Sequence, residues 1–240
     1  MKNFKKGAVK MKKKALFSVI FVGVITVFFS TGAFADTNVS GLIGSDTTWD
    51  TAGSPYIVTG NILVDTGVTL TIDPGVQVKF NADLSIQVDG TLLAQGTAEN
   101  KIIFTTNSLG DYWGYIYFSN SSTDATYDFD GNYTGGCILE YCLVEYAGGV
   151  SVSNNGAVRM ENAHPFINYC TIKNNESNGI FGWDLSQTLK ITNNIVSYNS
   201  GGGIDVRGGT NIISRNTITN NDMSGGWGGG IDARGNDIIS

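Results

Sequence analysis

The stretch that decides the fold is a seven-residue pattern that recurs in the second half of the chain. It reads ILEYCLV at residues 138–144, FINYCTI at 166–172, KITNNIV at 190–196 and IISRNTI at 212–218, and a fifth copy starts with IIS at 238–240. The second residues of successive copies are 28, 24, 22 and 26 residues apart. Short β-branched segments with a period of this length are typical of a solenoid, in which each repeat forms one coil.

The composition of the repeat distinguishes between two kinds of solenoid. Leucine-rich repeats have a similar length, but they need a leucine-rich consensus and a helical or 3₁₀ segment in each coil. Leucine is sparse here, and no stretch has an apolar period of 3.6 residues. The sequence therefore favours an all-β fold, a parallel β-helix, in which equivalent residues of successive coils lie about 4.8 Å apart.

The repeat predicts which side chains stack inside the coils. Four apolar columns are expected: Leu139, Ile167, Ile191, Ile213 and Ile239; Val144, Ile172, Val196 and Ile218; Val158, Ile180, Ile204 and Ile231; and Met160, Gly182, Val206 and Ala233. Between the first two columns, an inward turn position holds Cys142, Cys170, Asn194 and Asn216. Asparagine amides stacked at such a turn can hydrogen-bond from coil to coil and satisfy bent backbone groups.

The first half of the chain follows the same pattern with different residues. Apolar and polar residues alternate at 68–72, 76–80 and 84–88, with turn residues between these segments. About 180 residues at roughly 24 per coil give about seven coils over residues 61–240. We expect residues 36–60 to form an N-terminal cap. Because the fifth copy stops at Ser240, we also expect a β-helix that is truncated at its C-terminal end.

The first 35 residues are typical of a signal peptide. Seven lysines precede an apolar run from Ala15 to Phe29, and small residues at Ala33 and Ala35 mark a cleavage site before Asp36. A membrane anchor is the alternative, but a run of 15 residues is shorter than the roughly 18–20 that span a bilayer. We therefore expect a mature chain that is secreted or at the cell surface, without stable insertion in the membrane.

The charge of the mature chain limits its partners. Removal of residues 1–35 leaves 15 − 7 = 8 basic and 21 acidic side chains, a net charge of −13. Nucleic-acid binders need a basic surface, and anionic membranes attract basic segments, so neither partner is expected.

Three cysteines, Cys137, Cys142 and Cys170, are too few for a disulfide framework. Cys142 and Cys170 are expected on adjacent coils, where the Cα separation permits a bridge. Parallel stacking gives poor Cβ geometry for a disulfide, so reduced, buried thiols are favoured. A disulfide between the two residues is the alternative. With a single histidine in the chain, a zinc site of several ligands is excluded.

The segment from Asn61 to Thr105 resembles the opening coils of secreted right-handed parallel β-helix repeat proteins of the pectin-lyase-like superfamily. Residues 113–118 (WGYIYF) and the asparagine-rich coils from Cys137 extend the resemblance over roughly residues 45–240. The resemblance implies a right-handed β-helix and export. It implies no single activity, because many functions share this scaffold.

The resemblance also directs attention to catalytic groups of polysaccharide-active relatives. Hydrolases of the superfamily use clustered aspartates with a Gly-His-Gly element, whereas His164 lies between Ala163 and Pro165, which favours a structural histidine. Lyases of the superfamily use an arginine or lysine base with Ca²⁺ held by several acids. Arg207 and Arg234 do lie near acids, so the outer face that carries them is the candidate site.

Two columns are expected on this outer face: Arg159, Phe181, Asp205 and Asp232, and Glu161, Trp183, Arg207 and Arg234. Asp205 and Asp232 would lie about 5 Å apart, near the separation of a retaining glycosidase pair. An arginine two residues after each aspartate neutralises it, whereas a general acid needs a raised pKa. A structural ion-pair ladder is therefore favoured over sugar contact and catalysis. Phe181 and Trp183 are expected to be exposed, where they either stack on sugar rings or cover a neighbouring corner loop.

An acidic insertion between coils supplies the metal-ligand candidates Asp128, Asp130 and Asn132. Clustered oxygens suit Ca²⁺, which would be the only cofactor. The insertion lacks the glycine at loop position six and the distal glutamate of an EF-hand, so a solvated loop without a metal is favoured.

Together these patterns predict a non-catalytic binding or structural module that contacts extracellular polysaccharide or another cell-surface component. Its contact residues would be Phe181, Trp183, Asp205, Arg207, Asp232 and Arg234. Two alternatives stay open. One is a fragment of a polysaccharide lyase, hydrolase or epimerase whose catalytic residues lie beyond Ser240, and the other is an adhesin or passenger-type surface protein.

Overall fold

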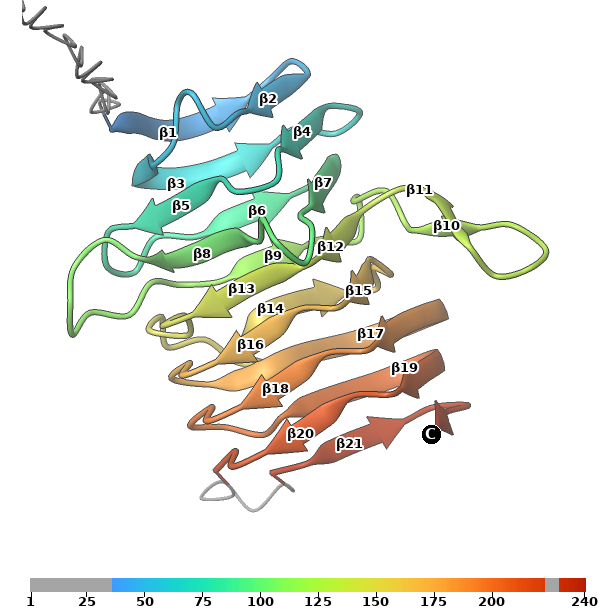
Figure 1. The fold of residues 1–240 in the computed structure, drawn as a ribbon. Coiled ribbons are helices and arrows are strands. Elements are labelled where there is room, and N and C mark those ends of the chain that lie inside the picture. The colour runs from blue at the N-terminus through green and yellow to red at the C-terminus, as the bar shows by residue number, and fades with distance from the viewer. Residues whose placement is uncertain (1–35, 223–228) are drawn as a thin grey trace, which may run out of the picture. The chain divides into compact units, whose positions relative to one another are not determined.

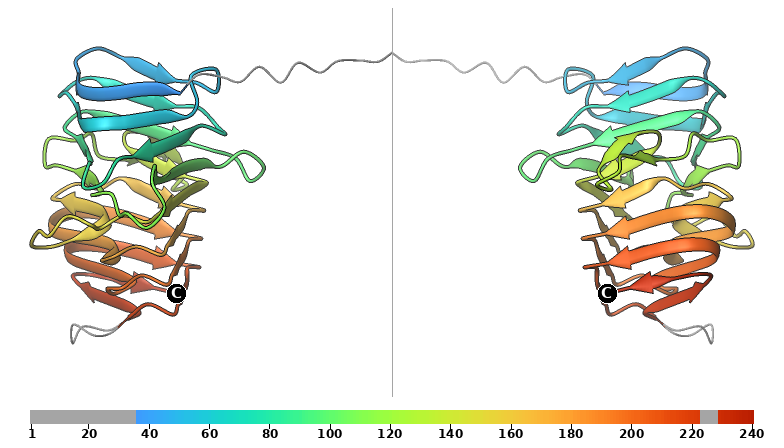
Figure 2. Two further views of the ribbon diagram at one scale, coloured as in Figure 1. Left: turned by 90° about the vertical axis from the view of Figure 1, so that its left-hand side faces the viewer. Right: turned by 90° about the vertical axis from the view of Figure 1, so that its right-hand side faces the viewer.

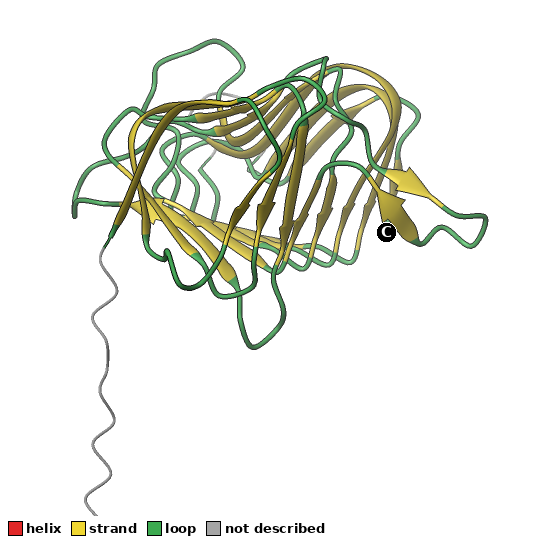
Figure 3. Ribbon diagram, turned by 90° about the horizontal axis from the view of Figure 1, so that it is seen from above, coloured by secondary structure: helices red, strands yellow, loops and turns green. Residues whose placement is uncertain are grey.

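Strands wind around a common axis in successive coils (Figure 1). The computed structural model describes residues 36–222 and 229–240, and these residues contain no helix. Twenty strands belong to one continuous parallel arrangement, and seen along the stack they form three faces, which we call A, B and C (Figure 3). The predicted all-β parallel solenoid is confirmed.

The strands of each face follow one another in chain order. Face A contains β2 (Thr47–Trp49), β4 (Thr69–Ile72), β7 (Thr91–Gln95), β12 (Ile138–Glu140), β15 (Phe166–Asn168) and β22 (Ile238–Ile239). Face B contains β5 (Gln77–Phe80), β8 (Ile102–Thr106), β13 (Cys142–Glu145), β16 (Thr171–Lys173), β18 (Ile195–Ser197) and β20 (Thr217–Thr219). Face C contains β6 (Ile86–Val88), β9 (Ile116–Phe118), β14 (Gly156–Glu161) and β21 (Ile231–Arg234).

Four long strands bend and contribute to two faces each. The first halves of β1 (Thr37–Ile43) and β3 (Tyr56–Val64) lie on face B and their second halves on face C. The first halves of β17 (Asn178–Thr192) and β19 (Ile204–Ser214) lie on face C and their second halves on face A. Each face therefore carries one rung per coil, and the rungs run in order from β1 to β22 (Figure 2).

The coil count corrects the expectation of about seven. The solenoid has about eight coils, because residues 37–49 form a coil of their own. Thr37 pairs with Tyr56, and Trp49 pairs with Ile72. The boundary expected after residue 60 falls inside β3, and the parallel ladder already starts at Thr37.

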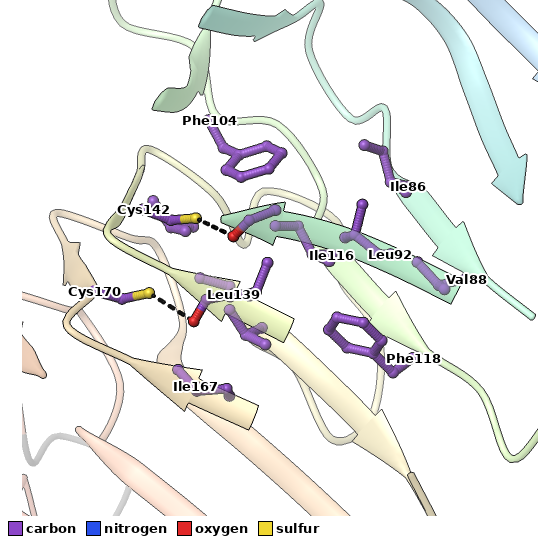
Figure 4. Packing of buried hydrophobic residues seen from close by; sticks show 14 of the residues in the cluster. Ile86, Val88, Leu92, Phe104, Ile116, Phe118, Leu139, Cys142, Ile167 and Cys170 are labelled. Carbon is purple, nitrogen blue, oxygen red and sulfur yellow. Dashed lines mark hydrogen bonds between the residues drawn. The ribbon is translucent and has the colours of Figure 1, made fainter. Parts of the chain in front are cut away.

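The predicted inward columns are present. Ile167 pairs with Leu139 on one side and with Ile191 on the other, and the column continues through Ile213 to Ile239. Pairings also join the members of the other three columns. Figure 4 shows part of this core, with Leu139 above Ile167. Stacked apolar side chains exclude water along the axis and supply the main driving force for folding.

Asparagine side chains connect the coils where face A turns into face B. The Oδ1 of Asn194 accepts the backbone N–H of Cys170, and its Nδ2 donates to the carbonyl of Ile167, at 2.8 and 3.0 Å. Asn216 does the same for Asn194 and Ile191. This predicted ladder satisfies backbone groups that the bend removes from the sheets.

A second asparagine ladder, absent from the sequence analysis, lies where face B turns into face C. It consists of Asn175, Asn199 and Asn221. Asn175 Oδ1 accepts the N–H of Ala147, and Asn199 Oδ1 accepts both the backbone N–H and the Nδ2 of Asn175. Asn175 and Asn199 are each only 1% exposed, so these hydrogen bonds are shielded from water.

The bends before both ladders use a left-handed backbone. Tyr141, Tyr169, Asn193 and Arg215 have φ between 48° and 58°, and each directly precedes a member of the first ladder. Non-glycine residues seldom adopt this conformation. Its recurrence in successive coils shows that the turn geometry is a property of the repeat.

One hairpin departs from the coil path. β10 (Thr126–Tyr127) and β11 (Tyr133–Gly135) pair antiparallel and project from the solenoid between β9 and β12 (Figure 1). Ala94 and Leu139 nevertheless pair directly on face A, so the insertion leaves the register of the coils intact.

The expected signal peptide, residues 1–35, lies outside the described residues. Within the part that is described, no helix is long and apolar enough to cross a bilayer.

Candidate functional site

The outer side of face C carries two clefts. The first, of about 370 Å³, lies over the early coils and is lined by Leu42, Leu63, Gln87, Tyr115 and neighbours. The second, of about 350 Å³, lies over the late coils. Its lining includes Asn154, Asn155, Ser177, Asn178, Phe181, Asp205, Arg207 and Asp232. Four of the six predicted contact residues therefore line one cleft, while Trp183 and Arg234 are not among its lining residues.

Two ion pairs stand on successive rungs beside the second cleft. Arg207 Nη2 and Nε donate to the two carboxylate oxygens of Asp205 at 2.7 and 3.1 Å. Arg234 forms the same fork with Asp232, at 2.6 and 3.1 Å. Asp205 pairs in register with Asp232, and Arg207 with Arg234, as predicted.

Arg234 also determines the protonation of its partner. Its hydrogen bond and positive charge lower the pKa of Asp232, against the opposing effect of burial. A carboxylate held ionised in this way accepts hydrogen bonds, but it has no proton to give to a leaving group.

Phe181 is buried, which corrects the expectation of an exposed ring. It is only 3% exposed, and the guanidinium carbon of Arg207 lies 4.8 Å from its ring centroid. A Cβ added at Gly156 on the preceding rung would lie 2.9 Å from the Phe181 Cβ, so the backbone at Gly156 leaves no room for a side chain beside Phe181. The phenyl ring therefore supports Arg207 and offers no free face.

Trp183 lies within a register break between β17 and β19. Gly182 pairs with Val206, but the next pair joins Leu185 to Gly208, so the expected stacking of Trp183 on Arg207 does not occur. The indole instead stacks on Tyr117, with ring centroids 6.1 Å apart and planes 2° apart. Both rings are half-buried, and each keeps part of its surface accessible.

Arg159 anchors a corner loop to this aromatic group. The guanidinium carbon lies 4.3, 5.2 and 5.3 Å from the ring centroids of Tyr115, Tyr117 and Trp183. Its Nε and Nη2 donate to the carbonyls of Asn154 and Ser153. Because Arg159 is only 8% exposed, these cation–π contacts and hydrogen bonds are largely shielded from water.

Glu161 completes the group, since the Tyr117 hydroxyl donates to its carboxylate. Burial, followed by this hydrogen bond and the charge of Glu161, raises the pKa of Tyr117 far above the ordinary value for tyrosine. The phenol therefore stays protonated and serves as a donor. In the two expected outer columns, Arg159 pairs with Phe181 and Glu161 pairs with Trp183. Tyr117 of β9, which sequence analysis did not assign, pairs with Arg159 on the other side. The alternation in WGYIYF at residues 113–118 contained that signal.

The predicted metal-ligand candidates form a turn of their own. The backbone N–H and the Nδ2 of Asn132 donate to the two carboxylate oxygens of Asp128, at 2.8 and 3.0 Å. These donors lower the pKa of Asp128. Asp130 lies at the tip, and the described residues contain no group of three or more His, Cys, Asp or Glu side chains that could hold a metal ion.

His164 is a buried structural residue, in agreement with its position beside a proline. Its Nδ1 lies 3.0 Å from Asp124 Oδ1, and its Nε2 accepts the backbone N–H groups of Ser186 and Gln187. Because Nε2 is an acceptor, Nδ1 carries the proton and donates to Asp124. Both ring nitrogens are thus occupied in holding a corner, and His164 is not among the lining residues of the two clefts on face C.

The three cysteines are free and buried, as favoured over a bridge. Cys142 Sγ donates to the carbonyl of Ala94, and Cys170 Sγ donates to that of Leu139, so each thiol points to a backbone acceptor (Figure 4). The two thiols occupy the ladder positions that asparagines take in later coils.

The match to known families agrees with the geometry. The family described as "Right handed beta helix region" matches residues 56–239, a span that begins at the first residue of β3 and ends at the last residue of β22. No curated protein and no solved structure matches the chain. The match confirms the predicted handedness and covers more than half of the sequence. The chain therefore belongs to the right-handed β-helix family.

Proposed function

We propose that this chain is an exported, non-catalytic module that binds extracellular carbohydrate on the outer side of face C. The observation that carries the proposal is the arrangement on face C, where a half-buried pair of stacked rings, Tyr117 and Trp183, lies on the same face as two aspartate–arginine forks and a cleft of about 350 Å³. Aromatic faces pack on apolar ring surfaces, while forks and amides bind hydroxyl groups.

The polar lining of the cleft supports a polyhydroxylated ligand. Asn154, Asn155, Ser177 and Asn178 add amide and hydroxyl groups to the carboxylates and guanidinium groups of the forks. Amide and hydroxyl groups both donate and accept hydrogen bonds, as the hydroxyl groups of a sugar do. The two forks are internally neutral, so the cleft favours a neutral or weakly charged glycan over a highly charged one.

The same forks argue for binding without catalysis. Glycoside hydrolysis needs one carboxylic acid that is protonated at working pH. Asp205 and Asp232 are each held by an arginine in two-point contact, and the contact with Arg234 lowers the pKa of Asp232. The arginines are likewise engaged by carboxylates and are not poised as bases.

Export is part of the proposal and rests on residues 1–35, with their lysine-rich start, apolar run and Ala33–Ala35 cleavage site. Pulse labelling of the cloned gene product tests it. We expect a shortened mature chain whose first residue is Asp36. A chain that keeps Met1 and stays inside the cell would contradict export.

A glycan array with matched variants tests the binding site. We expect the wild-type protein to bind a subset of neutral polysaccharides, and Trp183→Ala to weaken binding by about 10-fold or more through loss of stacking. Tyr169→Ala is the control, because Tyr169 is an exposed aromatic residue, 44% accessible, that stacks on Tyr141 at a different corner. Equal binding by wild type and Trp183→Ala would remove face C as the binding site.

The lyase alternative has a separate readout. Incubation with acidic polysaccharides, with and without Ca²⁺, is followed by ultraviolet absorbance of unsaturated products. We expect no change in absorbance. An increase that Arg207→Gln abolishes would replace the binding module with an enzyme.

A further inference from the structure

The β10–β11 hairpin, residues 126–135, stands away from the solenoid and takes no part in its rungs (Figure 1). At its tip, Phe129 is 105% exposed, which is full exposure for a phenylalanine side chain. Asp128 and Asp130 flank it, and both are exposed. Full exposure of a large aromatic side chain costs free energy in water, and a protruding hairpin has no need of one at its tip.

The tip is held in one conformation from within. Asp128 accepts two hydrogen bonds from Asn132, its carbonyl accepts the N–H of Gly131 at 3.0 Å, and its own N–H donates to the carbonyl of Asn132 at 2.9 Å. These contacts close the five-residue turn on itself. Phe129 is therefore presented on a fixed backbone, and little conformational entropy would be lost when it is buried by a partner.

The coils brace the hairpin both at its base and at its turn. Tyr127 and Tyr133 contact the ring of Phe166 on β15, with centroids 5.7 and 6.0 Å apart. Lys190 of β17 donates to the carbonyl of Gly131 at 3.0 Å, and its Nζ lies 3.6 Å from the Tyr127 ring centroid. Two coils thus fix the direction in which the hairpin projects.

We propose that the hairpin is a docking arm, on which Phe129 inserts into an apolar pocket of a partner protein whose rim carries lysine or arginine side chains. Aromatic residues are enriched at protein interfaces, where a single well-packed anchor contributes a large share of the affinity. Asp128 and Asp130 place two negative charges beside the anchor, which complement a basic rim and accelerate association.

Charge also argues against a second copy of this chain as the occupant. Residues 36–240 carry 8 basic and 21 acidic side chains, so two copies repel each other. The cleft over the early coils is lined by Asp83 and by no basic residue. It lacks the rim that the arm requires.

The arm is independent of the carbohydrate proposal, because it rests on a hairpin beside face A and not on face C. The protein could bind glycans on face C without a partner at the hairpin, or bind a partner through the hairpin without binding glycans. The two are therefore tested with different variants.

A random dodecapeptide library displayed on phage is the probe, panned on the immobilised purified protein with soluble Phe129→Ala protein as competitor. We expect the enriched peptides to combine lysine or arginine with large apolar residues. A synthetic peptide of this kind should bind the wild type and lose about 10-fold or more in affinity with Phe129→Ala. Asp130→Asn should weaken binding by about 2- to 5-fold at low salt, with the difference vanishing in 0.5 M NaCl.

Leu109→Ala is the matched control. Leu109 is 102% exposed on a different loop, so its truncation removes a comparable apolar surface. It should leave peptide binding unchanged, and all three variants should unfold at the wild-type temperature because the mutated side chains are exposed.

Three results would overturn the proposal. They are a selection that yields no peptide dependent on Phe129, equal loss of affinity with Leu109→Ala and Phe129→Ala, and a dimer in sedimentation that Phe129→Ala dissociates. The last result would make the occupant a second copy of the chain.

Discussion

Asn194 lies one coil before Asn216, and the Oδ1 of Asn216 accepts both the backbone N–H and the Nδ2 of Asn194, at 2.9 and 3.0 Å. One side-chain oxygen thus holds two donors of the neighbouring coil, and each asparagine of the ladder both accepts and donates. The ladder connects coils at a corner where the sheets are interrupted, and its members depend on one another.

Replacement of Asn194 by alanine should destabilise the protein by about 2–3 kcal/mol. The change leaves the N–H of Cys170 and the carbonyl of Ile167 without partners at a site that is 1% exposed, and an unpaired buried group costs about 1–3 kcal/mol. Urea unfolding followed by circular dichroism measures the loss. Thr217→Ala, on the outer side of the next coil, should change stability by less than about 0.5 kcal/mol. Equal stability of the two variants would show that the ladder contributes nothing.

The ion pair between Asp232 and Arg234 should lose its stabilising effect in acid. Because Arg234 lowers the pKa of Asp232 in the folded state, the pair stabilises the protein above the unfolded pKa of about 3.9, and this contribution is lost as the pH falls through the folded value. We expect wild type to exceed Asp232→Asn by less than about 1 kcal/mol at pH 7, since the pair is partly exposed, and to match it near pH 2–3.

A double-mutant cycle provides the control for this pair. In an Arg234→Gln background, Asp232→Asn should have the same effect at pH 7 and pH 3, as measured by urea unfolding at both values. A pH dependence that persists without Arg234 would assign the lowered pKa to another group.

Loss of the Arg159 guanidinium should free the corner loop between the two clefts. Arg159→Met keeps an unbranched stem of similar length but removes the donors to Ser153 and Asn154 and the cation–π contacts. We expect amide hydrogen exchange of residues 150–155 to accelerate by about 10-fold or more, with little change on face B. Unchanged exchange would mean that the loop is held by Asn155, whose Nδ2 donates to the carbonyls of Gly148 and Val150.

Two glycines with positive φ should differ sharply when changed to alanine. Gly136, with φ of 86°, has no room for a Cβ, which would lie 2.0 Å from the carbonyl oxygen of Asp124. Gly67, with φ of 78°, has open space around it. Both changes incur the left-handed backbone cost of about 1–2 kcal/mol, but only Gly136→Ala adds a steric clash. Thermal unfolding should therefore show a much larger loss for Gly136→Ala, and similar losses would contradict the close approach.

The thiols of Cys137 and Cys142 should be inert in the folded protein. Burial raises the pKa of Cys137 to about 12 and that of Cys142 well above its ordinary value. Because the thiolate is the nucleophile, iodoacetamide at pH 8 should leave these two residues unmodified, as measured by mass spectrometry. Alkylation in 6 M guanidinium is the positive control. Rapid labelling of the native protein would show that the coils open at this corner.

The coils were predictable because their sequence repeats. Once Leu139 and Ile167 were aligned, every later inward residue followed from the period, and the structure places them in register. The first coil was missed because β1, TNVSGLI, lacks the alternation that marks the next strands. The second asparagine ladder was missed although Asn175, Asn199 and Asn221 recur at intervals of 24 and 22 residues.

The candidate site was predicted only in part. The forks follow from the repeated Ile-Asp-x-Arg motif, since residues two apart in a strand share one side of it. The environment of Phe181 and Trp183 depends on a register break and on the corner loop that Arg159 anchors, and neither belongs to the repeat. The repeat period specifies which residues stack on one another along the axis. It does not specify how a corner loop packs against the outer side of the coils.

The direct pairing of Ala94 with Leu139 has an implication for how this architecture diversifies. Forty-four residues separate the two positions, and they include the rungs β8 and β9 as well as the whole β10–β11 hairpin. The hairpin does not alter the pairing of the rungs on either side of it. A corner of this kind can therefore accommodate inserted sequence. New recognition elements can be acquired, exchanged or deleted there while the coils that carry them are inherited unchanged.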